Sequence, residues 1–310
     1  MSSHAVPVRR RRIRGRAATP WLFAGPAVIL FVLFLLVPIG YAIFLSFRGS
    51  RLEGGGAYGR RVEGFIGLDN YAEALTDAEF LSGFGRVLIY GSISIPLVLG
   101  MALLFALLLD TPRARATRFS RTTIFLPYAV PGVIASLLWG FLYLPSTSPI
   151  SYIARELGGS ALPFFDYPTL YFSLANIALW SGVGFNMIII YTSLRSIPAE
   201  IYEAARLDGA SERTIALRIK IPLVTPAIVL TGLFSVIGTL QFYSEPQTLR
   251  PLANTISSTW VPLMWIYQEA FANDNLGGAA AASVFLAVGT LLLSLLILRF
   301  FQRRTFGDAE

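Results

Sequence analysis

Six apolar runs dominate this chain, and each is long enough to cross a lipid bilayer as a helix. A helix needs about 20 residues to traverse roughly 30 Å of hydrocarbon. The interiors of these runs contain no Asp, Glu, Lys, Arg or His. Because lipid offers no hydrogen-bonding partners to the backbone, such runs are expected to form membrane-spanning helices. The predicted spans are residues 21–47, 87–109, 123–144, 170–194, 223–243 and 280–301.

The basic residues lie mainly on one side of the predicted membrane. If the N-terminus is cytoplasmic, 18 of the 25 Lys and Arg residues fall in the two terminal segments and the two inner loops. Short cytoplasmic loops of membrane proteins carry an excess of Lys and Arg. Both termini are therefore predicted to be cytoplasmic. The net charge of +7 is attributed to this topology and not to nucleic-acid binding.

The predicted spans lack the residues that membrane enzymes and ion-coupled carriers use at depth for proton transfer, metal binding or coupling. The chain has no Cys, and its single histidine, His4, lies in the N-terminal tail. Its only lysine, Lys220, lies between isoleucines, so no Walker A sequence is present. A formal G-x-G-x-x-G match at 54–59 follows no predicted strand and is attributed to chance. We expect no catalytic residue, no metal site and an energy source outside this chain.

A long charged loop, residues 196–222, separates the fourth and fifth spans. Pro198 suits the start of a helix, where its missing N–H is harmless. Gly209 is expected to end that helix, because glycine readily adopts the left-handed conformation. Ser211 is a suitable N-cap for a second short helix, which Pro222 is expected to end. The loop is therefore predicted to be a rigid helix-turn-helix hairpin.

This hairpin resembles the EAA loop of permease subunits in binding-protein-dependent ATP-binding-cassette (ABC) importers. The family pattern is E-A-A, three residues, G, nine residues and I-x-L-P, and this chain departs from it at Ile221 in place of Leu. Weaker similarities at 65–71, 126–128 and 267–271 favour the maltose-type carbohydrate branch. The residues at 244–248 depart from that branch, which leaves the solute open. The expected ATPase-coupling residues are Glu203, Ala204, Ala205, Asp208 and Gly209.

The resemblance implies an all-α integral membrane protein with the fold of a type I ABC importer permease. Its six transmembrane helices would form one domain at 21–301, with the coupling loop at 196–222. A basic cytoplasmic tail at 1–20 and a short cytoplasmic tail at 302–310 would flank this domain. The expected location is the bacterial plasma membrane, with lipid around the spans.

The resemblance also implies partner proteins. They would be a second homologous permease, two copies of an ABC ATPase and an extracellular substrate-binding protein. ATP and Mg would be bound by the ATPase, so this chain is expected to be a non-enzymatic subunit without a cofactor of its own. Closure of the ATPase pair would move the hairpin as a rigid body and switch the translocation path between its inward- and outward-facing states.

The fourth and fifth spans carry most of the polar and aromatic residues at depth. Aromatic faces suit the apolar faces of sugars, and amides suit their hydroxyl groups, although the same residues also serve helix packing. The uncharged spans favour a sugar or a related neutral solute. An importer for glycerol phosphate or a polyamine is the first alternative, and an autonomous carrier or channel is the second. The candidate path residues are Trp180, Asn186, Ser235, Gln241, Phe242 and Tyr243.

Two outer segments, 69–84 and 259–271, are predicted to be amphipathic helices. The second is too short to span a bilayer. Packing against the membrane or another span is the expected role, and contact with the binding protein is the alternative. In the second segment one apolar stripe would contain Trp260, Leu263, Met264, Tyr267 and Phe271.

Overall fold

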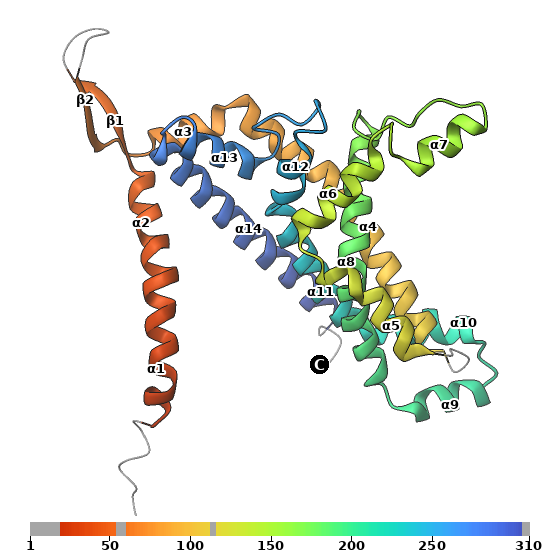
Figure 1. The fold of residues 1–310 in the computed structure, drawn as a ribbon. Helices are drawn as coiled ribbons and strands as arrows, with labels where there is room; N and C mark the ends of the chain where they lie inside the picture. Colours follow the sequence, from red (N-terminus) through yellow and green to blue (C-terminus); the bar gives the residue numbers. More distant parts are fainter. Residues whose placement is uncertain (1–18, 54–59, 112–115, 306–310) are drawn as a thin grey trace, which may run out of the picture.

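The computed structural model describes residues 19–53, 60–111 and 116–305, and within these ranges the chain is helical apart from one β-hairpin and the connecting loops (Figure 1). The basic tail before residue 19, the 54–59 stretch and residues 306–310 lie outside the described residues, so the predictions made for them remain predictions. The elements are α1 (Thr19–Phe31), η1 (Val32–Leu36), α2 (Val37–Ser46), β1 (Arg48–Glu53), β2 (Arg60–Phe65), α3 (Asp69–Thr76), α4 (Ala78–Leu109), α5 (Thr117–Phe125), η2 (Leu126–Ala129), α6 (Gly132–Tyr143), α7 (Pro149–Glu156), α8 (Thr169–Arg195), α9 (Ala199–Leu207), α10 (Glu212–Ile215), η3 (Ala216–Lys220), α11 (Ile221–Leu240), α12 (Ser244–Leu249), α13 (Pro262–Phe271) and α14 (Leu276–Thr305).

The helices that are able to span a membrane agree in place with the sequence prediction. Five helical stretches are long and apolar enough to cross a bilayer, and the number is six if a bent pair of helices is counted as one span. Helix α4 begins outside the predicted second span, and α14 continues to Thr305, into the segment predicted to be a tail. The five stretches are Phe23–Ser46, Ala78–Leu109, Thr169–Arg195, Glu212–Leu240 and Leu276–Phe301.

The third span is not the single helix that the apolar run predicts. The segment Thr117–Ala129 meets α6 at an angle of 94°. Between them Val130 is extended, with φ −80° and ψ 125°, and Pro131 follows it. A residue before proline is pushed out of the helical region by the proline ring. The composition of the run therefore predicts a span correctly, while the two prolines at 127 and 131 determine where it bends.

Pro222 does not end the second helix of the charged loop, as the sequence analysis expects. The helix that starts at Glu212 passes through the π turn η3 and continues as α11 to Leu240. Pro222 lies in the first turn of α11, directly after the π turn, where the missing N–H is tolerated. The second helix of the hairpin is thus continuous with the fifth span, with no loop between them.

The core is built around the close pairing of α4 with α8. Ala102 and Ala106 on α4 are fully buried and let α8 approach closely, where Met187 and Ile190 are also fully buried. A second cluster of buried side chains lies toward the outer ends of the same helices and includes Trp260 from the α12–α13 connection. These two clusters hold the second, fourth and fifth spans in one bundle.

Gly184 marks the closest approach of α8 to the bent third span. A Cβ atom at this position would overlap the carbonyl oxygen of Ile124 and lie 2.6 Å from the Cα of Phe125. Overpacking typically costs about 1–3 kcal/mol, and here the obstructing atoms are backbone. Gly184→Ala is therefore expected to lower the thermal stability of the purified protein by several degrees. The matched control is Gly100→Ala on α4, where a Cβ meets nothing within 4 Å; equal melting temperatures for the two variants would contradict this packing.

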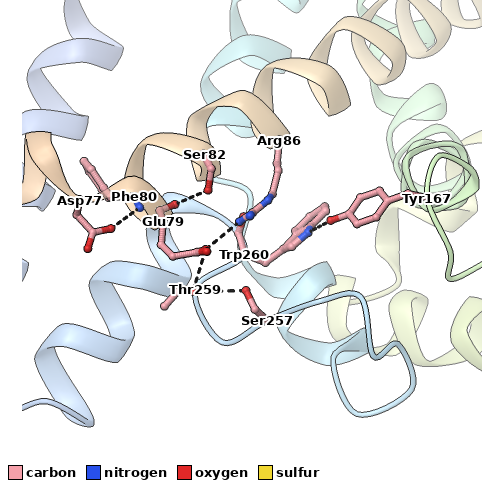
Figure 2. A network of polar contacts seen from close by, with 9 residues as sticks. All are labelled: Asp77, Glu79, Phe80, Ser82, Arg86, Tyr167, Ser257, Thr259 and Trp260. Atoms are coloured by element: carbon pink, nitrogen blue, oxygen red, sulfur yellow. Dashed lines mark hydrogen bonds and ion pairs between the residues drawn. The ribbon is translucent and has the colours of Figure 1, made fainter.

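A polar network fastens the outer end of α4 to the α12–α13 connection (Figure 2). Arg86 donates a hydrogen bond of 3.0 Å to the carbonyl oxygen of Trp260 and lies 3.4 Å from a carboxylate oxygen of Glu79. The indole N–H of Trp260 donates to the hydroxyl of Tyr167, just before α8. Trp260 itself is buried. Three segments far apart in the sequence are thereby held together at the outer face.

The two outer segments differ in detail from their predictions. The first is two helices, α3 and α4, separated at Asp77, whose carboxylate accepts a 2.7 Å hydrogen bond from the N–H of Phe80. In the second, α13 starts only at Pro262. Its predicted apolar stripe is divided, because Trp260 and Met264 are buried while Phe271 is 75% exposed.

The sequence analysis does not predict the β-hairpin that follows the first span. Strands β1 and β2 pair antiparallel, with Arg48 opposite Phe65. The first span stands apart from most of the bundle (Figure 1) and packs on it through α14. Its apolar side chains are largely exposed in the isolated chain, as Phe34 shows at 75%. This surface suits lipid or another apolar helix.

Candidate functional site

The charged loop folds as two short helices, α9 and α10, at the end of the bundle opposite the β-hairpin (Figure 1). Gly209 has φ +83°, and its N–H donates to the carbonyl of Arg206 at 3.0 Å. The next N–H, of Ala210, donates to Ala205 at 2.9 Å. This pair of bonds is the Schellman arrangement that ends a helix with a left-handed residue. The predicted turn at Gly209 is confirmed.

The start of α10 and the contact between the two helices make the hairpin compact. The Ser211 hydroxyl accepts a 3.2 Å hydrogen bond from the N–H of Thr214, so the predicted N-cap is confirmed. Arg206 pairs with Glu212 across the turn at 2.9 Å. Helices this short depend on such contacts, since they are not stable alone.

The predicted coupling residues lie together on α9 and the turn that follows it. Ala205 is half-buried, and the other four are exposed. Beside them Leu207 is 89% exposed, which leaves an apolar side chain on the surface of the hairpin. The exposed residues of the predicted set are Glu203, Ala204, Asp208 and Gly209.

A buried aspartate at the end of α4, which sequence analysis does not single out, joins both sides of this hairpin. Asp110 lies 2.6 Å from the Lys220 ammonium and 3.8 Å from the Arg195 guanidinium. The side chains of Asp110 and Lys220 are only 3% and 5% exposed. Arg195 ends α8, and Lys220 ends η3. One carboxylate therefore fixes the entry to the hairpin and its exit to the end of the second span.

Tyr202 connects the same ion pair to α9. The Lys220 ammonium lies 4.9 Å from the centre of its ring, a cation–π distance. Burial, with a further contribution from the Asp110 carboxylate, raises the pKa of Tyr202 above its usual value. We name Asp110, Lys220, Arg195 and Tyr202 the hairpin clamp. It connects both ends of the hairpin and α9 to the end of α4.

A cavity of about 560 Å³ opens at the centre of the bundle. Its walls come from α4, η2, α8, α11 and the start of α12. Two stacked aromatic pairs form part of the wall, Tyr90 with Phe242 at 4.0 Å and Tyr128 with Phe185 at 4.9 Å between ring centres. Its polar lining residues include Ser94, Ser181, Asn186, Ser235, Thr239, Gln241, Ser244 and Glu245.

The structure brings four of the six predicted path residues to this cavity, namely Asn186, Ser235, Gln241 and Phe242. Trp180 and Tyr243 do not line it. Trp180 packs edge-on against Trp139, with the ring centres 6.2 Å apart. Tyr243 faces Tyr267 at 5.9 Å and lines a neighbouring groove beside α13 and α14, which shares Gln241 and Ser244 with the cavity. Neither residue lies on this cavity, so their place on the translocation path stays a prediction.

Sequence reasoning misses several residues of the lining. Tyr90 and Ser94 lie one helical turn apart on α4, a polar strip that could have indicated a cavity-facing side. Tyr128 comes from the 3₁₀ turn of the bent third span, which a straight helix would not predict. Ser181 also lines the cavity, and its hydroxyl finds no hydrogen-bond partner among the described residues.

Glu245 is the most consequential of the missed residues. By sequence it lies beyond the fifth span, but α11 ends at Leu240 and the chain turns at Tyr243 into α12, which returns the side chain to the cavity. Its carboxylate is half-buried and faces the first residue of α6, 3.7 Å from where a Cβ of Gly132 would lie. Burial raises the pKa of the Glu245 carboxyl above its usual value.

The cavity and the hairpin belong to a fold found in known transport proteins. Residues 78–306 match the family described as "Binding-protein-dependent transport system inner membrane component". The chain belongs to this family. It is therefore a multi-pass permease subunit of an ABC importer, and the match covers every element that lines the cavity or forms the hairpin.

Individual relatives are similar in sequence to this permease over nearly its whole length. It is 31% identical to the probable ABC transporter permease protein YurN of Bacillus subtilis, over 91% of this chain and 96% of that protein. It is 27% identical to the diacetylchitobiose uptake system permease protein NgcF of Streptomyces coelicolor, over 97% of this chain and 87% of that protein. It is 28% identical to the sn-glycerol-3-phosphate transport system permease protein UgpA of Agrobacterium fabrum, over 92% of this chain and 95% of that protein.

A solved structure supports the fold. A chain from a bacterial ABC transporter involved in the import of the acidic polysaccharide alginate superposes with a TM-score of 0.79 at 21% identity, and the match covers 95% of this permease and 97% of that chain. The predicted fold class, an all-α type I importer permease, is confirmed.

Proposed function

We propose that this permease forms half of the path by which a sugar or a related neutral solute enters the cell. The observation that carries the proposal is the central cavity, which pairs aromatic rings with uncharged polar groups. Rings suit the apolar faces of sugars, and hydroxyl and amide groups suit their hydroxyls. Relatives named for sugar uptake support the same solute class.

The partners follow from the architecture of such importers. A second homologous permease supplies the other half of the path, two copies of an ABC ATPase bind ATP and Mg, and an extracellular binding protein delivers the solute. The termini lie in the cytoplasm of a bacterium, as the distribution of basic residues favours. This chain supplies neither a catalytic residue nor a cofactor.

The hairpin is the coupling element in this proposal. The exposed Glu203 pairs with a basic residue of the ATPase, and Ala204 permits close approach of its surface. Since α8 and α11 both line the cavity and flank the hairpin, a rigid movement of the hairpin reorients two cavity walls at once. The hairpin clamp transmits the same movement to α4.

The test is to purify the chain from its native membrane together with the proteins that bind it. We expect a second permease and an ATPase to co-purify. In liposomes that contain the complex, the binding protein and the transported sugar together should stimulate ATP hydrolysis and drive uptake. Sugar flux through the chain alone, without ATP or partners, would instead indicate an autonomous carrier.

A further inference from the structure

The central cavity carries a single charged side chain among the described residues that line it. Glu245 supplies a carboxylate, and the lining contains no Lys, Arg or His. The remaining polar lining groups are hydroxyls and amides, which serve neutral solutes. The cavity therefore has a negative electrostatic bias that the apolar composition of the spans conceals.

The Glu245 carboxylate is not neutralised within the part of the chain that the structure describes. No described basic side chain forms an ion pair with it, in contrast to Asp110, which contacts both Lys220 and Arg195. One of its oxygens lies 3.7 Å from where a Cβ of Gly132, the first residue of α6, would lie. A helix N-terminus carries only a partial positive charge and no full one. The charge consequently remains available to the solute.

We propose that Glu245 is a specificity-determining residue that admits neutral and amine-bearing solutes to this half of the path and disfavours anionic ones. This inference rests on the proposed function, because it assumes that the solute passes through the central cavity. It predicts that this permease disfavours anions such as sn-glycerol 3-phosphate, the solute for which one relative is named.

The physical basis is the strength of a single charge in a cleft with low-dielectric walls. Such a cleft focuses the field of the carboxylate, which raises the local concentration of cations and lowers that of anions. A carboxylate also accepts hydrogen bonds from the hydroxyl or ammonium groups of a sugar, but it has no proton to donate to a solute carboxylate or phosphate. Neutral and amine-bearing sugars gain contacts here, whereas anions are repelled.

The absence of cysteine makes a direct test simple, because Ser235→Cys gives the chain one thiol, on the cavity wall. The assembled complex is placed in lipid nanodiscs at pH 8, to favour the carboxylate form. Rates of modification are measured by the mass of this chain with cationic trimethylammonium-ethyl, anionic sulfonatoethyl and neutral methyl methanethiosulfonates. The neutral reagent corrects for changes in thiol reactivity.

We expect Glu245→Gln to lower the cation-to-anion rate ratio at Ser235→Cys by about tenfold, the scale of one unit charge acting over several ångströms in a partly hydrated cleft. Glu245→Asp, which retains the charge, should preserve most of the ratio. A cysteine at Leu157, which is 82% exposed on the outer surface, is the matched control and should not respond to Glu245→Gln. A ratio unchanged within twofold at Ser235→Cys would overturn the proposal.

A second comparison separates failure of this inference from failure of the proposed function. Modification of Ser235→Cys is measured without nucleotide and after trapping with ATP and vanadate. A translocation path that alternates between its two sides should give different rates in the two states. State-dependent rates with no charge preference would refute only the role of Glu245, while rates independent of state would refute the cavity as the path.

Discussion

Replacing Asp110 by alanine is expected to destabilise the permease by about 3–5 kcal/mol, because removal of one partner of a buried ion pair leaves the other charge unpaired. The Lys220 ammonium would keep only its contact with the Tyr202 ring, in a site where its side chain is 5% exposed. The loss should appear as a lower melting temperature of the assembled complex and a lower yield. ATP hydrolysis should also respond less to the binding protein, since the hairpin would no longer be fixed to α4.

Two further variants distinguish loss of the ion pair from a general folding defect. Lys220→Met should be milder than Asp110→Ala, because Asp110 retains Arg195, whose side chain is 66% exposed. The double variant Asp110→Asn with Lys220→Met removes both buried charges and should recover most of the stability. It should not recover full coupling, because the link from α4 to the hairpin stays broken. If the complex with Asp110→Ala has the same melting temperature as the unaltered complex, the clamp does not contribute to stability.

The sequence predicts the membrane architecture well because one physical property decides it. In lipid, the backbone N–H and C=O groups of a long apolar run find hydrogen-bond partners only within a helix. The number and order of the spans can therefore be predicted from composition. The bend of the third span is missed, because Pro127 and Pro131 lie within an apolar run that is long enough to be one straight helix. The β-hairpin is missed because its strands are short and the sequence between them, residues 54–59, is rich in glycine.

The candidate site is only partly predictable. The sequence indicates how deep in the membrane a residue lies, but it does not indicate which neighbour its side chain faces. Asn186 and Trp180 lie on the same helix, yet one reaches the cavity and the other packs on Trp139. Glu245 is misjudged because the prediction treats the end of a span as the end of the cavity. The Asp110–Lys220 pair joins residues 110 positions apart, and nothing in the local sequence of either residue indicates the other.

Gly209→Pro is expected to abolish coupling between ATP hydrolysis and uptake while the chain still inserts and assembles. Proline fixes φ near −65°, but the residue at this position has φ +83°. Proline also removes the N–H that donates to the carbonyl of Arg206 at 3.0 Å. The turn would have to open, and α9 would lose its fixed angle to α10. The measurement is ATP-driven uptake by the reconstituted complex, with ATPase activity followed in parallel.

A graded series at the same position ties the effect to backbone geometry and not to side-chain size. The left-handed conformation costs an ordinary residue about 1–2 kcal/mol, and asparagine and aspartate tolerate it better than alanine does. Uptake should therefore fall in the order Gly, Asn, Ala, Pro. A Cβ at Gly209 would meet no atom of the described residues within 4 Å, so alanine meets no steric obstacle beyond the strain of its backbone. Full uptake by Gly209→Pro would mean that the hairpin does not transmit movement as a rigid body, and the role assigned to Glu203 would lose its mechanical basis.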